Sequence, residues 1–218
     1  MRSLFVFPLM AIAALAQPVS FGVRAGVPLT DLLNASSALP QPGSPPSRPF
    51  TSTTNRYLIG PTIEVRLPLG LSLGFDALYR HYDFSSPGFV TAPPAIYIMQ
   101  GAERAEGGDW EFPLMAKYHF SSKLVRPYVG AGVAWDRLGG SSAIICAINC
   151  GTSSTPPELR HDTVTGFVAG VGIDIHVPVL HLSPEIRYTR WGAQHFVSSS
   201  GVLSSNQNQA EFLLGITF

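Results

Sequence analysis

Few side chains in this sequence are placed to perform catalysis or to bind a metal ion. His119, Phe120 and Ser121 form a His-x-Ser sequence, and a histidine can activate a serine hydroxyl when an acid orients the imidazole. The nearest acid on the same predicted strand, Glu111, lies at the other end of that strand. A histidine facing an interior and a serine capping a turn explain both residues, so we predict no catalytic residue.

The other histidines and the two cysteines do not predict a metal site. The remaining histidines are dispersed along the chain: His81, His161, His176, His181 and His195. Cys146 and Cys150 lie in a stretch rich in glycine, serine and threonine, without paired His or acidic ligands nearby. In an oxidising compartment they would form a small disulfide or remain free thiols. Since no phosphate-binding loop or nucleophile elbow is present, we expect no cofactor.

The first 16 residues predict export. A short positively charged opening precedes an apolar run from Leu4 to Leu15, which is shorter than the roughly 20 residues of a membrane helix. Ala14-Leu15-Ala16 supplies a small-x-small cleavage site. The alternative is a buried helix of a soluble protein. We expect a cleavable signal peptide over residues 1–16.

The composition favours one all-β domain over residues 17–218. Charged residues make up 13% of the chain, the formal net charge is zero, and there are 21 glycines and 19 prolines. A disordered chain would be more charged and less apolar. Zero net charge gives no support for nucleic-acid binding, for which a basic patch would be expected.

Eight stretches alternate apolar and polar residues with a period of two, which is typical of strands with one apolar face. The last runs from Gln209 to Phe218. The other seven cover about 19–29, 55–67, 71–84, 109–120, 125–138, 163–177 and 181–196.

The connections between these stretches alternate strictly between long and short. Long ones cover residues 30–54, 85–108, 139–162 and 197–208. The first is rich in proline and serine, and we expect it to have no secondary structure of its own. The pattern predicts an eight-stranded antiparallel up-and-down transmembrane β-barrel with short periplasmic turns and long extracellular loops. A barrel of this size has an interior filled by side chains.

With these features the chain resembles the small bacterial outer-membrane β-barrels of the OmpA/OmpX-like superfamily. The resemblance rests on the export signal, the eight strands and the final aromatic Phe218, and it covers essentially the whole chain after residue 16. It implies a fold rather than an activity. It also implies that the barrel-assembly machinery reads the apolar face of the last strand, namely Phe212, Leu214, Ile216 and Phe218.

Aromatic residues near the loop ends of the strands predict a girdle at the membrane boundary. Its members are Trp110, Trp135, Trp191, Tyr57, Tyr79 and Tyr188. One detail conflicts with this prediction, because strict alternation points Trp191 inward and Arg190 outward. Either a β-bulge near Gly192 or a position of Arg190 above the hydrocarbon would remove the conflict.

The charged residues of the strands lie on the face opposite the apolar one, and we interpret them as a structural polar network inside the barrel. They are Arg24, Glu64, Arg66, Asp76, Arg80, Glu111, Lys117, Asp136, Asp174, Glu185, Arg187 and Glu211. Facing lipid at mid-membrane, a basic residue would cost about 2–4 kcal/mol, whereas opposite charges inside can pair. Glycines on the same face have no side chain to fill the interior, at positions 130, 132, 166, 170 and 172.

The sequence therefore predicts a non-enzymatic, integral outer-membrane protein of a Gram-negative-type bacterium. Its role would be structural or adhesion-like and carried by the extracellular loops. The expected partners are outer-membrane lipid and lipopolysaccharide, the assembly machinery during biogenesis, and an unidentified surface ligand, but no nucleic acid.

Three alternatives remain open. The inward glycines allow a narrow porin-like channel for small solutes. His119 and Ser121 allow an enzyme that modifies lipid A, because one group of outer-membrane barrel enzymes uses a His-x-Ser arrangement with an acid. The third alternative, a soluble periplasmic ligand-binding barrel, would need an apolar interior.

Overall fold

A computed structural model describes residues 19–35, 50–54, 56–86, 90–92, 95–97, 102–121, 125–146, 150–156, 158–176, 180–197 and 203–218. The predicted signal peptide lies outside these ranges, so its cleavage stays a prediction. Within the same ranges, no helix is long and apolar enough to cross a membrane.

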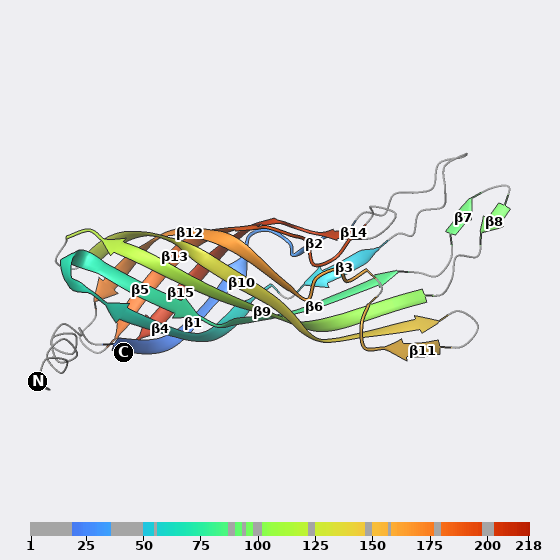
Figure 1. Cartoon of the computed structure of the whole chain (residues 1–218), viewed down its shortest axis with the longest axis horizontal. Helices are drawn as coiled ribbons and strands as arrows, with labels where there is room; N and C mark the ends of the chain where they lie inside the picture. The colour runs from blue at the N-terminus through green and yellow to red at the C-terminus, as the bar shows by residue number, and fades with distance from the viewer. Residues whose placement is uncertain are drawn as a thin grey trace, which may run out of the picture.

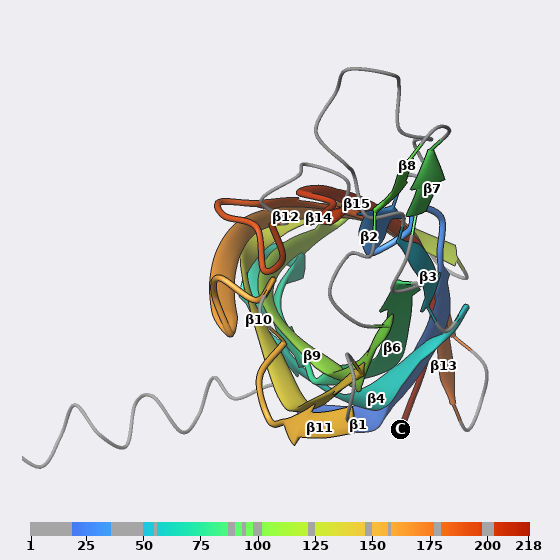
Figure 2. The same cartoon turned by 90° about the vertical axis from the view of Figure 1, so that its right-hand side faces the viewer.

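Eight antiparallel strands close into a barrel, as the sequence predicts. β1 (Val19–Pro28) pairs with the last strand, β15 (Asn208–Thr217), and with β4 (Leu58–Arg66). The remaining wall strands are β5 (Leu71–Asp76) continued by β6 (Leu78–Ser86), β9 (Ala102–His119), β10 (Val125–Cys146), β12 (Thr163–His176) and β13 (His181–Trp191). Because the first and last strands pair, the wall forms the complete ring seen along its axis in Figure 2.

The barrel wall is apolar outside and charged inside. Many large apolar side chains are exposed on it, among them Phe21, Val23, Ile59, Val129, Phe167, Val171, Ile186 and Phe212. By contrast, Arg24, Arg80 and Arg187 are among the largest fully buried side chains. A soluble ligand-binding barrel requires the opposite distribution, whereas a membrane-spanning barrel requires this one.

The two ends of the barrel differ in the length of their connections. At one end, the 3-10 turn η1 (Pro68–Gly70) joins β4 to β5, and the C-terminal residue Phe218 lies at this end as well (Figure 1). At the other end, β9 with 18 residues and β10 with 22 residues extend well past the shorter strands. The barrel therefore continues at this end as an extension beyond the shorter strands.

Parts of the predicted loops form strands, so the expectation of an unstructured first loop is wrong. β3 (Thr51–Thr54) pairs with β6, and β2 (Leu33–Ala35) pairs with β14 (Leu203–Ser205). Both strands of the first loop adjoin buried apolar residues, which stabilise them. In the other long connections, β7 (Val90–Ala92) and β8 (Ala95–Tyr97) form a hairpin, and β11 (Cys150–Ser153) pairs with β10.

Cys146 and Cys150 are backbone partners at the β10–β11 turn. Their side chains lie outside the part of the chain that the structure describes. The disulfide therefore stays a prediction.

Gly60 is placed where a side chain would prevent close contact between strands. A Cβ atom at Gly60 would overlap the carbonyl oxygen of Ala77, the residue between β5 and β6. A Cβ atom at Gly151 would meet nothing within 4 Å. We predict that Gly60→Ala lowers the free energy of unfolding by about 1–3 kcal/mol and that Gly151→Ala leaves it unchanged. Urea unfolding of both detergent-folded variants, monitored by heat-dependent gel mobility, measures these free energies. Equal stability of the two variants would contradict the packing described.

Candidate functional site

A ring of ion pairs fills the middle of the lumen. Arg24 of β1 donates to Asp76 of β5 over 3.2 Å and to Glu185 of β13 over 2.8 Å. Arg187 donates to the same two carboxylates over 2.7 and 2.8 Å. Tyr128 donates its hydroxyl to Glu185 over 2.8 Å. These four charged side chains are at most 5% exposed, so two buried arginines pair with two buried carboxylates in the middle of the lumen.

The ring continues toward the turn end through a lysine. Lys117 Nζ lies 3.4 Å from both Glu185 and Glu64, and His119 Nε2 lies 3.8 Å from Glu64. Glu64 is thus an acid beside His119 that sequence reasoning missed, because it belongs to a different strand and only the closed barrel brings the two together. The interactions described include none between His119 and Ser121, whose side chain is exposed.

A second contact at the turn end involves Arg66. Its Nη2 lies 2.9 Å from His181 Nδ1 and 3.6 Å from the Asp174 carboxylate. The partly exposed Arg66 therefore marks the edge of the interior network.

Carboxyl groups dominate the lumen toward the loop end. Arg80 donates to Asp109 over 2.6 and 3.1 Å and to Gln209 over 3.3 Å. Asp136 lies near enough to Asp109 for the two carboxyl groups to interact electrostatically. This level of the lumen therefore holds more acidic groups than Arg80 alone can pair.

The same loop-end level holds a second carboxyl pair. Glu111 of β9 and Glu211 of β15 lie near enough to interact electrostatically, and both are at most 2% exposed. Arg187 and Arg80 lie near enough to act on both charges. All 12 residues predicted to face the lumen are thereby placed on its inner side.

His195, which follows β13, completes the network at the loop end of the barrel. His195 Nε2 lies 3.1 Å from Asp136 Oδ2, and Nδ1 donates to the His161 carbonyl oxygen over 2.7 Å. Burial lowers the pKa of His195, and the hydrogen bond to His161 opposes that effect. The Arg160 N–H donates to the His195 carbonyl oxygen over 2.7 Å. These contacts join the chain before β12 to the chain after β13, across the mouth of the barrel.

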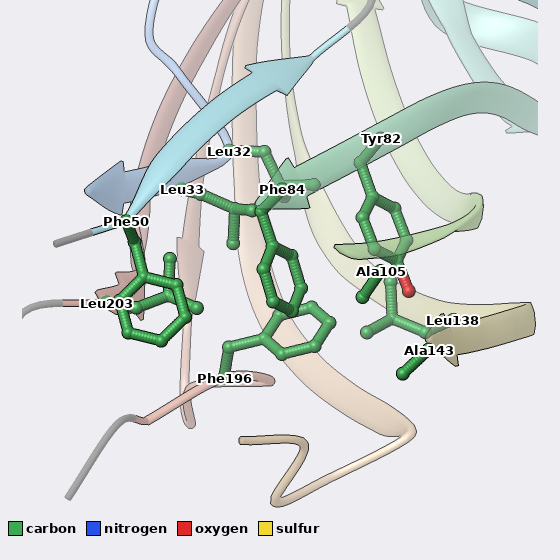
Figure 3. Packing of buried hydrophobic residues seen from close by; sticks show 10 residues of the cluster. All are labelled: Leu32, Leu33, Phe50, Tyr82, Phe84, Ala105, Leu138, Ala143, Phe196 and Leu203. Carbon is green, nitrogen blue, oxygen red and sulfur yellow. The ribbon is translucent and has the colours of Figure 1, made fainter. Parts of the chain in front are cut away.

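Above the charges lies an apolar cluster, here named the cap core. It consists of Leu32, Leu33, Phe50, Tyr82, Phe84, Ala105, Leu138, Ala143, Phe196 and Leu203 (Figure 3). The Phe196 ring packs edge-on against Tyr82 and Phe84 at 5.6 and 5.4 Å, and Phe84 packs against Phe50 at 6.1 Å. Since all four long connections contribute at least one residue, the cap core holds them together as one folded unit.

The predicted girdle holds except at one position. Trp110, Trp135, Tyr57 and Tyr188 are exposed on the outer wall, and the partly exposed Tyr79 packs on Trp110 at 5.1 Å.

Trp191 does not belong to this girdle, so that prediction is wrong. It is 2% exposed and packs inside the barrel against Met115, Val164 and Val168. It pairs with Gly166 in regular register, without the bulge that would turn it outward. Arg190 is the residue that faces outward, and it donates to Asn208 over 2.6 Å.

The inward glycines make room for large side chains rather than for water. A Cβ atom at Gly172 would overlap the Tyr128 ring, and one at Gly166 would lie 2.7 Å from the Trp191 ring. This packing removes the observation on which the narrow-channel alternative depended.

The apolar face of β15 lies on the outside of the barrel. Its exposed residues are Phe212, Leu214, Ile216 and Phe218. They are accessible to a membrane or to an assembly factor, and their recognition by the assembly machinery stays a prediction. Within the described ranges, no group of three or more His, Cys, Asp or Glu side chains could hold a metal ion.

The closed ring of strands, the apolar wall and the ion-paired lumen together decide the class of protein. The chain is a small closed β-barrel with the apolar outer wall and charged interior of a membrane-spanning barrel.

Comparisons with known proteins give structural likenesses only. No family model and no curated protein sequence matches this chain. The N-terminal β-barrel domain of Pseudomonas aeruginosa OprF is 15% identical, covers 93% of this chain and 99% of its own, and has a TM-score of 0.40. Neisserial surface protein A is 16% identical, with coverages of 91% and 94% and a TM-score of 0.44. The outer membrane protein AlkL is 15% identical, with coverages of 92% and 89% and a TM-score of 0.40. These likenesses carry no argument about function.

The ion-pair ring makes a quantitative prediction. Glu185 pairs with three buried cations, namely Arg24, Lys117 and Arg187. Glu185→Gln removes the carboxylate that they share, so we expect a loss of about 3–5 kcal/mol in the free energy of unfolding. Adding Arg187→Met removes the excess cation, and the double variant should be less destabilised than the sum of the two single changes.

Arg104→Met is the matched control, because Arg104 is 65% exposed and its ion pair with Asp83 is long, at 3.8 Å. An exposed pair contributes about 0–1 kcal/mol. Urea unfolding in lipid vesicles measures all four variants. Additive losses for Glu185 and Arg187 would contradict the pairing described here.

Proposed function

We propose that this protein is a sealed outer-membrane barrel that binds a surface partner through its extracellular extension. The observation that carries the proposal is the cap core, which joins all four long connections above a lumen filled by ion pairs. On this account the protein is exported by residues 1–16, and its short-turn end faces the periplasm.

The filling of the lumen favours binding over conduction. A solute would have to break the apolar cap core, the contact between His195 and Asp136, and then the Arg24–Glu185 ring. Each opening would leave buried charges without partners, which is strongly unfavourable. A barrel of eight strands has little space for a path around them.

The order within the extension favours a binding surface. Fixing long connections costs conformational entropy, roughly 1–2 kcal/mol per residue for the backbone alone. The cap core offsets that cost before any partner arrives, and a preformed surface binds with a smaller entropic loss. Outside the cap core, side chains such as Ile144 and Arg104 face outward from the extended β9 and β10 strands.

The location of His119 and Ser121 favours a non-catalytic protein. Both lie at the turn end, on the periplasmic side of the proposed orientation and away from the outer leaflet. The acid beside His119 is Glu64, which also lies 3.4 Å from Lys117. An acid that neutralises a lysine is less available to orient a catalytic imidazole.

The attachment test compares an intact and a disrupted cap. The protein is displayed on a non-adherent laboratory bacterium, and attachment to surfaces coated with laminin, collagen or fibronectin is counted. We expect Phe84→Ala with Phe196→Ala to reduce attachment at least tenfold, because losing two packed rings loosens the cap. The heat-dependent gel shift should persist, since the wall is unchanged.

Phe120→Ala removes an aromatic ring at the opposite end of the barrel and serves as the matched control. It should attach as the unmodified protein does. Attachment by the cap variant at the level of the control, or no attachment by the unmodified protein to any of the three surfaces, would overturn the proposed function.

A further inference from the structure

The pairing of β9 and β10 is interrupted on the outer wall just above the aromatic girdle. Gly139 pairs with Gly108 and Ser142 pairs with Glu106, so two residues of β10 lie opposite one residue of β9. This is a β-bulge, which changes the direction of nearby side chains. Gly140 within it has a φ of 63°, a conformation that glycine adopts without steric cost.

The bulge leaves an opening on the outer face of the barrel. Tyr82, inside the extension, forms a 2.8 Å hydrogen bond with the Ser141 hydroxyl and so holds one bulge residue inward. On the outside, a Cβ atom at Gly139 or Gly140 would meet nothing within 4 Å. The wall is therefore hollowed at this point rather than filled.

Two adjoining crevices occupy the hollow. The upper one, ≈ 290 Å³, is lined by His81, Glu106 and Ser142 together with Trp110 and Gly139. The lower one, ≈ 390 Å³, shares Trp110 and Gly139 and is otherwise lined by Phe112 and Arg137. Volumes of about 300–1,000 Å³ are usual for small-molecule sites.

The two crevices differ in polarity: the lower one, toward the membrane, is mostly apolar, and the upper one is polar. Trp110 and Phe112 are nearly parallel, with an interplanar angle of 9° and ring centroids 6.2 Å apart, and they form an apolar surface on the membrane side. Tyr79, the cross-strand neighbour of Trp110 on β6, packs beside it with ring centroids 5.1 Å apart. The imidazole, carboxylate and hydroxyl groups of the upper crevice lie on the aqueous side of this girdle.

Arg137 supplies a positive charge at the boundary. It pairs across the strands with Trp110 and its side chain is exposed. Among the described residues, no carboxylate forms an ion pair with it. A guanidinium group is suited to bind a phosphate through two parallel hydrogen bonds.

We propose that this hollow binds one phosphorylated glycolipid of the outer leaflet. An acyl chain lies along Trp110 and Phe112, the phosphate binds Arg137, and sugar hydroxyls bind in the upper crevice. The site is on the barrel wall, so it does not depend on whether the extension binds a surface partner.

The carboxylate distinguishes a glycolipid from an ordinary anionic phospholipid. Glu106 repels a phosphate, but it accepts hydrogen bonds from sugar hydroxyl groups, as does the His81 ring when neutral. Aromatic rings such as Tyr79 offer an apolar face beside these polar groups. Both kinds of lipid carry a phosphate that Arg137 attracts and Glu106 repels. A phosphorylated disaccharide also offers more hydroxyl donors to Glu106 and His81 than the small headgroup of phosphatidylglycerol does.

Native mass spectrometry of the full mature protein in detergent tests this proposal, with purified lipid A as the probe and phosphatidylglycerol as the competitor. Gly139→Leu fills the hollow, and because its Cβ atom meets no neighbour the barrel should still fold. Gly151→Leu, equally unobstructed but outside the hollow, is the matched control. Arg137→Gln removes the charge alone.

We expect lipid A to bind the unmodified protein and the Gly151→Leu control equally, and to bind Gly139→Leu and Arg137→Gln at least tenfold more weakly. The heat-dependent gel shift should show that every variant is folded. The proposal is overturned if Gly139→Leu binds lipid A as the control does, if phosphatidylglycerol competes as well as lipid A, or if no lipid A binds.

Discussion

The structure depends on the pairing of charges that are buried in the lumen. Arg24 and Arg187 each contact both Asp76 and Glu185, and these residues come from β1, β5 and β13, which are far apart in the sequence. The wall can present only apolar residues to lipid if the polar residues of every strand are satisfied inside. The ion-pair ring, the glycines that admit Tyr128 and Trp191, and the closure by His195 follow from this one requirement.

The sequence predicts most of the wall because the alternation of apolar and polar residues determines which face each residue occupies. Alternation alone places Arg24, Lys117 and Glu211 inside and Val129 and Phe167 outside. It also places Trp191 inside, against the usual preference of tryptophan for the membrane boundary. Here the position in the register decides the side, since Gly166 leaves space for the indole ring within the barrel.

The extension at the loop end could not be predicted in the same way. The first part of β9, from Ala102 to Gly108, contains glycines and charges that are typical of a loop, and it is a strand because β10 and β6 pair with it on both sides. Leu33 and Leu203 each belong to a short polar segment and gain their apolar surroundings only in the cap core. The proximity of Glu64 to His119 also requires knowledge of the strand order. Such contacts between distant segments have no local sequence signal.

The central claim is that the lumen is sealed, and the accessibility of one buried position to water tests it most directly. Met115 faces the lumen and is 1% exposed. In a protein with Cys146 and Cys150 replaced by serine, Met115→Cys is treated in lipid vesicles with a small charged thiol reagent, and Ser121→Cys, exposed at the turn end, is the reference. The account predicts that the cysteine at position 115 reacts only after unfolding, while the one at 121 reacts at once. Comparable rates at the two positions in the folded protein would mean that water and ions pass through the barrel, and the sealed lumen would be wrong.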